Sequence, residues 1–185
     1  MARIPYPDLS ALPPKAQEFQ ARINPNVNIF RMIPWAETVF PHWHRLGNAF
    51  LTRTALDPIL REMAIVRTGH LRGSTYEVHQ HNRISARIGM AAEKIAALAE
   101  GASSDVFDET EKLVLRFTDE VVKDGKATDA TFAAAAERFS NRELCELTLV
   151  IGFYIMVSAF LETLEIELEA DEGATDGALP NVGRP

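Results

Sequence analysis

Two acidic residues and a histidine could form an acid–base cluster in the middle of the chain. Glu77 and His81 are four residues apart, so on one α-helix they would differ by about 40° around the axis and could share a small pocket. A carboxylate beside an imidazole fixes one tautomer and raises its basicity, which leaves the other ring nitrogen free to exchange a proton with a substrate. Glu62 lies on the preceding predicted helix, joined by a short turn, so the two helices can pack antiparallel. The spacing therefore predicts that Glu62, Glu77 and His81 meet.

Each of these residues also has a structural explanation. Ser74 and Glu77 fit a capping box, in which the glutamate binds the helix N-terminus and needs no catalytic role. His81 could be a core histidine that is held by a hydrogen bond. Glu62, Glu77 and His81 could also bind a divalent metal, but they supply only three ligands and match no known metal motif. We therefore expect no metal.

Other polar residues offer weaker candidates. Arg67 and Arg83 could bind a substrate carboxylate, because a guanidinium group presents a planar fork of donors. His79 lies about 200° from Glu77 and His81 around the helix, so it should point elsewhere. The single cysteine, Cys145, excludes an internal disulfide and any C-x-x-C motif, and a thiol in an apolar helix is usually an inert packing residue.

The elements that position these residues are all predicted to be helices. Asp57-Pro58 provides an N-cap followed by proline at the first helical position, Ser140 to Glu143 form a capping box, and no segment has the pattern of a strand. The predicted helices cover residues 15–22, 28–33, 35–51, 58–70, 75–88, 91–100, 108–125, 128–139 and 140–164. We expect one all-α domain over residues 1–185, with a proline-rich arm at 1–14 and a flexible tail at 170–185.

Composition argues against nucleic acid and membrane partners. The chain of 185 residues has 26 acidic and 19 basic side chains, a net charge of -7, which would repel a phosphate backbone. The longest apolar run, Leu147 to Leu161, is shorter than the ~20 residues that span a bilayer. The first residues lack the apolar stretch of a signal peptide. We therefore expect a cytoplasmic protein.

The segment that contains Glu62, Glu77 and His81 resembles the carboxymuconolactone decarboxylase family, which includes the alkylhydroperoxidase D-like (AhpD-like) proteins. The likeness is carried by LREMAIVR with Glu62, by Tyr76-Glu77, by His81 and by Ile88-Gly89-Met90, and it covers about residues 40–125. It implies a helical bundle of the AhpD-like type. It also implies assembly into a homo-oligomer, whether dimer, trimer or hexamer.

Comparison with the two branches of this family bears on the chemistry. The peroxidase branch carries a glutamate, a C-x-x-C and a histidine; Glu62 and His81 match the first and last, but Ser74 and Glu77 stand at the cysteine positions. Without both thiols the peroxidase route cannot operate. The pattern Y-E-x-x-x-x-H instead looks like the decarboxylase branch, whose activity requires no cofactor.

The resemblance implies cofactor-free decarboxylation or proton transfer on a small carboxylated lactone or a related intermediate of aromatic degradation. The expected catalytic residues are Glu62, Glu77 and His81, and the expected substrate-binding residues are Tyr76, Arg67 and Arg83. Two alternatives stay open. One is a redox protein that acts through Cys145 without the usual C-x-x-C, and the other is a non-catalytic oligomer that binds a ligand.

Overall fold

The computed structural model describes residues 1–23 and 27–170, and every regular element in these ranges is a helix. The α-helices are α1 (Pro14–Gln20), α2 (Asn28–Met32), α3 (Phe40–Arg53), α4 (Pro58–Arg72), α5 (Thr75–Arg87), α6 (Ala92–Ala97), α7 (Glu109–Asp124), α8 (Asp129–Ala136) and α9 (Asn141–Leu164). Short 3-10 helices cover Leu9–Ala11, Ile33–Ala36 and Gly101–Ser103. The predicted all-α class is confirmed. The predicted tail lies, apart from Ala170, outside the described residues.

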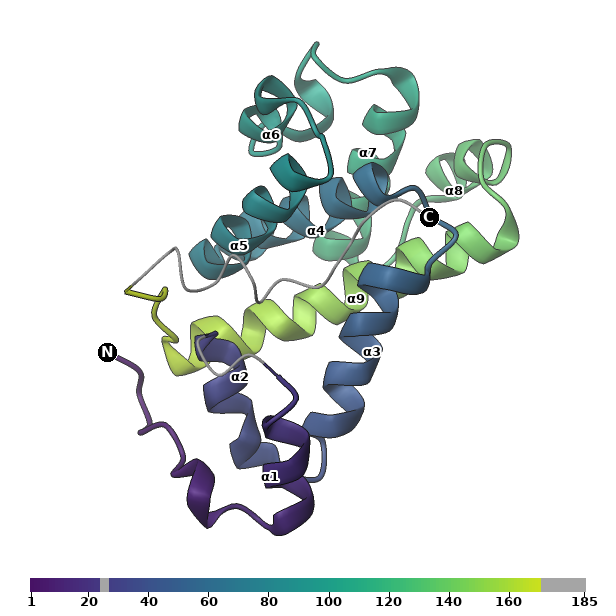
Figure 1. The fold of residues 1–185 in the computed structure, drawn as a ribbon. Helices are drawn as coiled ribbons and strands as arrows, with labels where there is room; N and C mark the ends of the chain where they lie inside the picture. The colour runs from purple at the N-terminus through teal and green to yellow at the C-terminus, as the bar shows by residue number, and fades with distance from the viewer. Residues whose placement is uncertain (24–26, 171–185) are drawn as a thin grey trace.

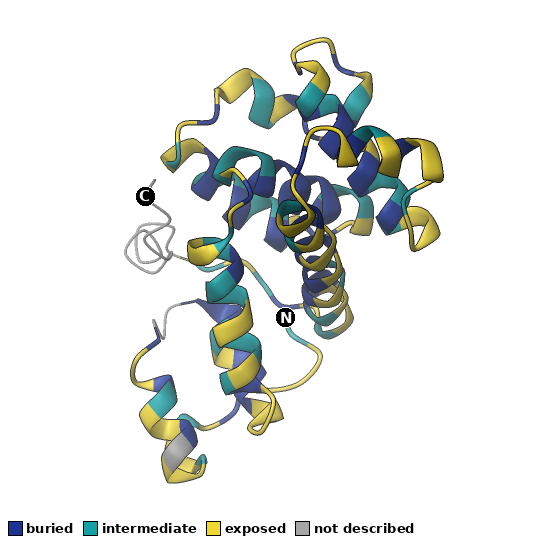
Figure 2. Ribbon diagram, turned by 90° about the vertical axis from the view of Figure 1, so that its right-hand side faces the viewer, coloured by how far each residue is buried: buried dark blue, intermediate teal, exposed yellow. Residues whose placement is uncertain are grey.

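Helix α4 is the centre of the structure. It packs against α5, α7 and α9, and its residues 61–69 are all buried, as expected for a helix that is covered on every side. Helix α9 crosses the middle of the molecule, with α4 to α7 on one side and α1 and α2 on the other (Figure 1). In Figure 2 the buried residues concentrate on the inward faces of the helices.

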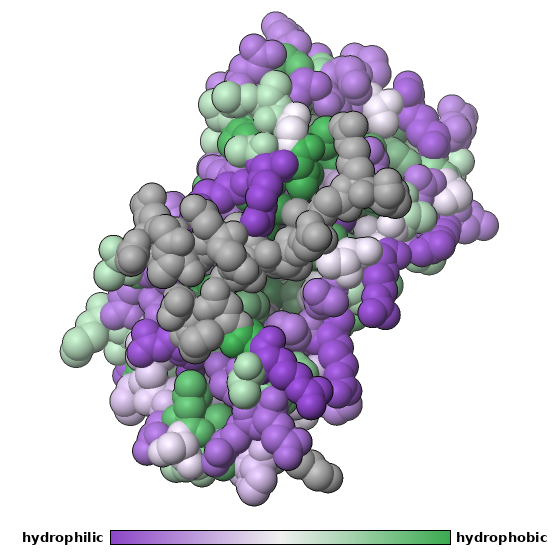
Figure 3. All heavy atoms as spheres, in the orientation of Figure 1, coloured by the Kyte–Doolittle hydropathy of each residue, from purple (hydrophilic) through white to green (hydrophobic). Residues whose placement is uncertain are grey.

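Helix α9 has one buried face and one exposed face. Leu147, Ile151 and Tyr154 are buried, whereas Leu149 and Met156 are 60% and 48% exposed. By length and composition alone α9 could cross a bilayer, but half of its apolar 18-residue stretch is buried inside the fold. Hydrophilic side chains predominate on the face of the molecule in Figure 3. These features describe a soluble helical domain with α9 as a core helix.

Two of the three predicted helix starts are confirmed at the level of hydrogen bonds. The Asp57 carboxylate accepts from the backbone N–H groups that open α4, and Ser140 with Glu143 forms the full capping box of α9. The capping box predicted for Ser74 and Glu77 is wrong, because the Ser74 side chain makes no capping hydrogen bond. Glu77 lies on the buried face of α5, so its carboxylate faces the interior instead of the helix end.

The helix predicted over residues 35–51 starts later than expected. The chain forms a 3-10 turn at Ile33–Ala36, and α3 begins at Phe40 with Pro41 in its first turn. Pro41 therefore helps to open α3, in keeping with the preference of proline for the first helical turn.

A tight connection folds α5 back onto α4. Gly73 ends α4 in the left-handed region, at φ 68°, which favours glycine because a side chain there is strained. One turn earlier, Gly69 allows a close approach, since a Cβ atom there would lie 3.1 Å from Cγ2 of Val78. This antiparallel packing brings position 62 of α4 beside position 81 of α5.

Candidate active site

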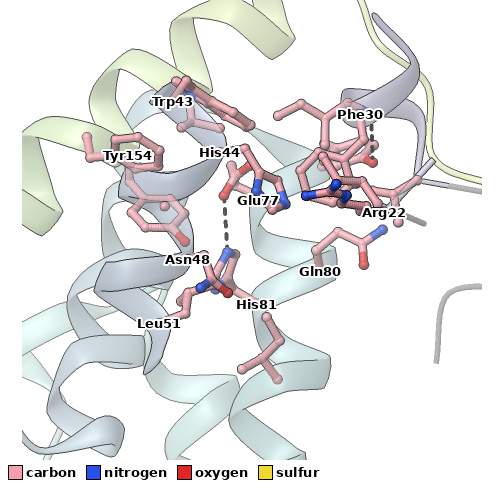
Figure 4. A pocket seen from close by; sticks show the side chains of 18 residues that line it. Arg22, Phe30, Trp43, His44, Asn48, Leu51, Glu77, Gln80, His81 and Tyr154 are labelled. Carbon is pink, nitrogen blue, oxygen red and sulfur yellow. Dashed lines mark hydrogen bonds and ion pairs between the residues drawn. The ribbon is translucent and has the colours of Figure 1, made fainter. Parts of the chain in front are cut away.

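His81 lies between two carboxylates that come from two helices. Its Nδ1 atom is 2.6 Å from Oε2 of Glu62, and its Nε2 atom is 3.5 Å from Oε2 of Glu77. Figure 4 shows Glu77 and His81 facing each other at the cavity wall. The structure therefore brings together the three side chains that the sequence predicts to meet.

Glu62 is the inner member of this cluster. It is completely buried, and its Oε1 atom accepts from Nε and Nη2 of Arg61, both at 3.1 Å. A carboxylate only accepts hydrogen bonds, so the proton on the His81 ring is assigned to Nδ1. This leaves Nε2 as the ring atom that faces Glu77 and the cavity.

Burial and charge raise the pKa values of both Glu77 and His81. Burial raises the pKa of Glu77 to about 7, and the negative charge of Glu62 adds to this rise while His81 opposes it. Burial lowers the pKa of His81, but attraction and the hydrogen bond from Glu62, together with attraction from Glu77, outweigh it, so the pKa of His81 is raised overall. Glu77 can therefore hold a proton near neutral pH beside an imidazole whose protonated form is favoured, an arrangement that suits acid–base catalysis.

A cavity of about 230 Å³ lies against this pair. Its walls come from residues 22, 23, 27, 29 and 30 and from α3, α5 and α9, and they are mostly aliphatic and aromatic. The ring of Tyr154 meets the His81 ring edge to face at 4.8 Å, and burial followed by the charges of Glu77 and Glu62 raises the pKa of Tyr154 well above its usual value. The polar lining residues outside the Glu77–His81 pair are Arg22, His44, Asn48, Tyr76, Gln80 and Tyr154.

The Glu77 carboxylate has hydrogen-bonding capacity left for a ligand. Its Oε2 atom is buried and accepts no hydrogen bond within the described residues, although it lies 3.5 Å from Nε2 of His81. A buried acceptor of this kind is costly unless water or a ligand satisfies it. A hydroxyl or acid proton of a bound molecule would supply the missing bond.

The described residues offer no additional metal ligands beside Glu62, Glu77 and His81. In residues 1–23 and 27–170 no group of three or more histidine, cysteine, aspartate or glutamate side chains is arranged to hold a metal ion. Within the cluster, both ring nitrogens of His81 already face carboxylates.

The predicted substrate-binding residues separate into two groups. Tyr76 lines the cavity, whereas Arg67 and Arg83 do not. Arg67 is buried beside α7, where its guanidinium group donates to both carboxylate oxygens of Asp119 at 2.6 and 2.8 Å. It also donates to backbone carbonyl groups after α6. Arg67 is therefore a link between helices, a position that does not fit its predicted role in substrate binding.

Sequence reasoning missed several of the lining residues. Arg22 is the arginine that reaches the cavity among the described residues, and His44, Asn48 and Gln80 also line it. Gln80 could have been found from its spacing, since it is three residues from Glu77 on the same helix. Arg22 and His44 carry no such local signal, because they arrive from other parts of the chain. Cys145 is exposed on α9 and is not a lining residue.

Residues 37–120 match the model of the carboxymuconolactone decarboxylase family. The match covers the part of the chain from α3 to most of α7. Glu62, Glu77 and His81 all lie inside the matched region. No curated protein has significant sequence similarity to the chain.

Solved structures share the fold of this chain. The chain is similar to an alkylhydroperoxidase AhpD core protein, described as peroxidase-related, from Ralstonia eutropha JMP134, with a TM-score of 0.80 and 21% identity over 97% of this chain and 98% of that one. A peroxidase-related protein from Silicibacter sp. TM1040 has a TM-score of 0.78 and 15% identity over 91% and 92% of the two chains. A putative antioxidant defence protein AhpD from Agrobacterium tumefaciens has a TM-score of 0.70 and 20% identity over 75% and 96%.

Proposed function

We propose that this protein is a cofactor-free enzyme that moves a proton during decarboxylation, or a related enol reaction, of a small carboxylated lactone or similar acid. The observation that carries the proposal is the position of His81, held by Glu62 and facing Glu77 at the wall of a mostly apolar cavity. A carboxyl group with a pKa of about 7 beside a histidine with a raised pKa suits proton transfer to carbon.

The reaction follows from this arrangement. Loss of carbon dioxide breaks one carbon–carbon bond and leaves its electron pair in a dienolate, delocalised into the lactone carbonyl. His81 delivers a proton from Nε2 to the ring carbon, while Glu62 holds Nδ1–H and stabilises the imidazolium form. Glu77 returns a proton to His81 and takes up a proton from solvent before the next turnover.

The cavity also suits an acidic substrate. Arg22 places a cation at the cavity, and apolar groups from α3 and α9 enclose the rest. Arginine recognises carboxylates through two parallel N–H donors. Arg22 therefore takes the place in this proposal that the sequence assigned to Arg67 and Arg83.

A variant of His81 tests the proposal. Purified protein is incubated with a panel of carboxylated unsaturated lactones, and release of carbon dioxide is followed. We expect His81→Ala to lower turnover by about 10²–10⁴-fold, the usual contribution of a positioned acid or base. His79→Ala is the matched control, because His79 lies on the same helix outside the cavity lining. Full activity of His81→Ala would remove His81 from the mechanism.

A thiol-dependent redox function has less support in this chain. The structural neighbours are described as peroxidase-related, but the single cysteine is exposed on α9 and lies outside the cavity lining. Peroxide reduction through a dithiol needs two cysteines that can reach one another.

We also propose that two copies of the chain associate through the exposed face of α9. Leu149 and Met156 are exposed two turns apart on this face, with Gly152 between them. In an antiparallel pair about Gly152, Leu149 of each copy would meet the Met156 position of the other, so the face is complementary to itself. A small residue at the crossing lets two helices approach closely.

A further inference from the structure

Helix α5 carries a second pair of buried polar side chains beside the acid–base pair. Tyr76 and Gln80 precede Glu77 and His81 by one position each, line the same cavity, and are 4% and 5% exposed. The backbone N–H of Asn28, at the start of α2, reaches the same place. We call the Tyr76 hydroxyl, the Gln80 amide N–H and the Asn28 backbone N–H the donor triad.

The donor triad binds one carboxylate, that of Glu169. Oε1 of Glu169 accepts from Asn28 N at 2.7 Å and from the Tyr76 hydroxyl, and Oε2 accepts from Nε2 of Gln80 at 2.6 Å. Burial, followed by the hydrogen bond and the charge of Glu169, raises the pKa of Tyr76, so its hydroxyl keeps its proton and donates. The Tyr76 hydroxyl also accepts from the backbone N–H of Ile29 at 3.3 Å. All three donors of the triad reach Glu169 through its two carboxylate oxygens, so a ligand carboxylate could accept the same bonds.

Glu169 is not needed to hold its own segment in place. It ends a strap, residues 165–169, that follows α9 without regular structure. Glu165 of the strap pairs with Arg3 at 2.7 Å, and Glu167 accepts from Ala2 N at 2.9 Å and from Tyr6 at 3.0 Å. The carboxylate of Glu169 can therefore leave the triad while the strap stays attached.

A donor triad without any bound carboxylate would destabilise the folded protein. Its side-chain members are buried, and buried donors that lose their acceptor are destabilising. Such a site favours the exchange of one carboxylate for another over simple release. Arg22 at the same cavity adds a positive charge that attracts an anion.

We propose that the donor triad is the carboxylate-binding subsite of the cavity, and that Glu169 competes with the carboxylate of the ligand for it. This inference deepens the proposed function, since it names the anchor of the acidic substrate. Tyr76 and Gln80 directly precede Glu77 and His81 in the sequence, and all four residues line the same cavity. A ligand whose carboxylate is bound by the triad can therefore extend through the cavity toward His81.

Binding of benzoate tests the subsite without any turnover. Benzoate has the required carboxylate and an aromatic body that suits the apolar walls, and isothermal titration calorimetry measures its affinity. We expect Glu169→Ala to bind benzoate at least tenfold more tightly than the natural protein, because the competitor is gone. Adding Tyr76→Phe to Glu169→Ala should weaken binding by roughly 10-fold or more, as expected for one hydrogen bond to a charged group.

Two controls isolate the effect. Glu165→Ala removes the same charge from the same strap, contacts Arg3 and not the triad, and should leave the affinity unchanged. Benzamide, which lacks the charge, should gain nothing from Glu169→Ala. If Glu169→Ala fails to fold, Glu169→Gln serves instead, since it keeps the size of the side chain and should also bind benzoate more tightly than the natural protein.

The inference is overturned if Glu169→Ala binds benzoate no better than Glu165→Ala, or if Tyr76→Phe leaves the gain intact. Either result would make Glu169 a structural contact only. Loss of the proposed function would be recognised separately, by equal turnover of His81→Ala and the natural protein, whatever the affinity for benzoate.

Discussion

At the scale of single residues, Glu77 couples the stability of the protein to pH. Its pKa is about 7 in the folded protein and 4.5 for the unperturbed group, so between these values the folded state holds a proton that the unfolded state has released. Stability then falls as pH rises. The raised pKa of His81 acts in the same direction, because the stability it adds below its unfolded pKa is lost as pH rises through the folded one.

We therefore expect the free energy of unfolding of the natural protein to fall between pH 5 and pH 8, and Glu77→Gln to flatten this fall. The Glu77 contribution is at most roughly 3 kcal/mol, at 1.36 kcal/mol per pKa unit. Urea denaturation at a series of pH values measures it. Glu93→Gln, which changes an exposed glutamate of α6, should follow the natural protein. Equal slopes for both variants would contradict the raised pKa of Glu77.

At the scale of elements, the Arg67–Asp119 pair ties α4 to α7 and to the turn after α6. The guanidinium group lies against Gly101, where a Cβ atom would be 2.6 Å from its Cζ atom. Burial raises the pKa of Asp119, but hydrogen bonds from Arg67 and Lys123 outweigh it and hold that pKa below its usual value. This contact fixes the helix that carries Glu62 against its neighbour.

Arg67→Met should lower the free energy of unfolding by about 3 kcal/mol or more, because Asp119 keeps only Lys123 as a charged partner and two carbonyl groups lose the Arg67 donor. Affinity for a carboxylate ligand should stay the same, since Arg67 does not line the cavity. Arg116→Met on α7, an exposed arginine, should change stability by less than about 0.5 kcal/mol. The opposite pattern, with normal stability and weak ligand binding, would restore Arg67 to the substrate site.

At the scale of the whole molecule, the exposed face of α9 is the surface that would join two copies. We expect the double variant Leu149→Asp, Met156→Asp to elute as a monomer, because two charges would have to be buried in the interface. Light scattering after size-exclusion chromatography measures the mass. Phe132→Asp on α8, at another exposed apolar position, should leave the assembly intact. A natural protein that is already monomeric would contradict the proposal.

Local patterns were sufficient to predict the helical class, the start of α4 and the start of α9. Caps and helical periodicity depend on residues three or four apart, so they can be read before the fold is known. The meeting of Glu62, Glu77 and His81 followed from the same local spacing and one short turn. Sequence alone therefore determined the elements and the centre of the site.

Tertiary packing decided which other side chains reach the cavity. Glu77 does not cap α5, because its face of that helix is buried. Arg67 forms an ion pair with Asp119, which is 52 residues away in the sequence. Arg22 and Glu169 came to the site from the two ends of the chain, and Glu169 is 93 residues from Tyr76. Contacts over such separations depend on how whole helices pack, which no local pattern encodes.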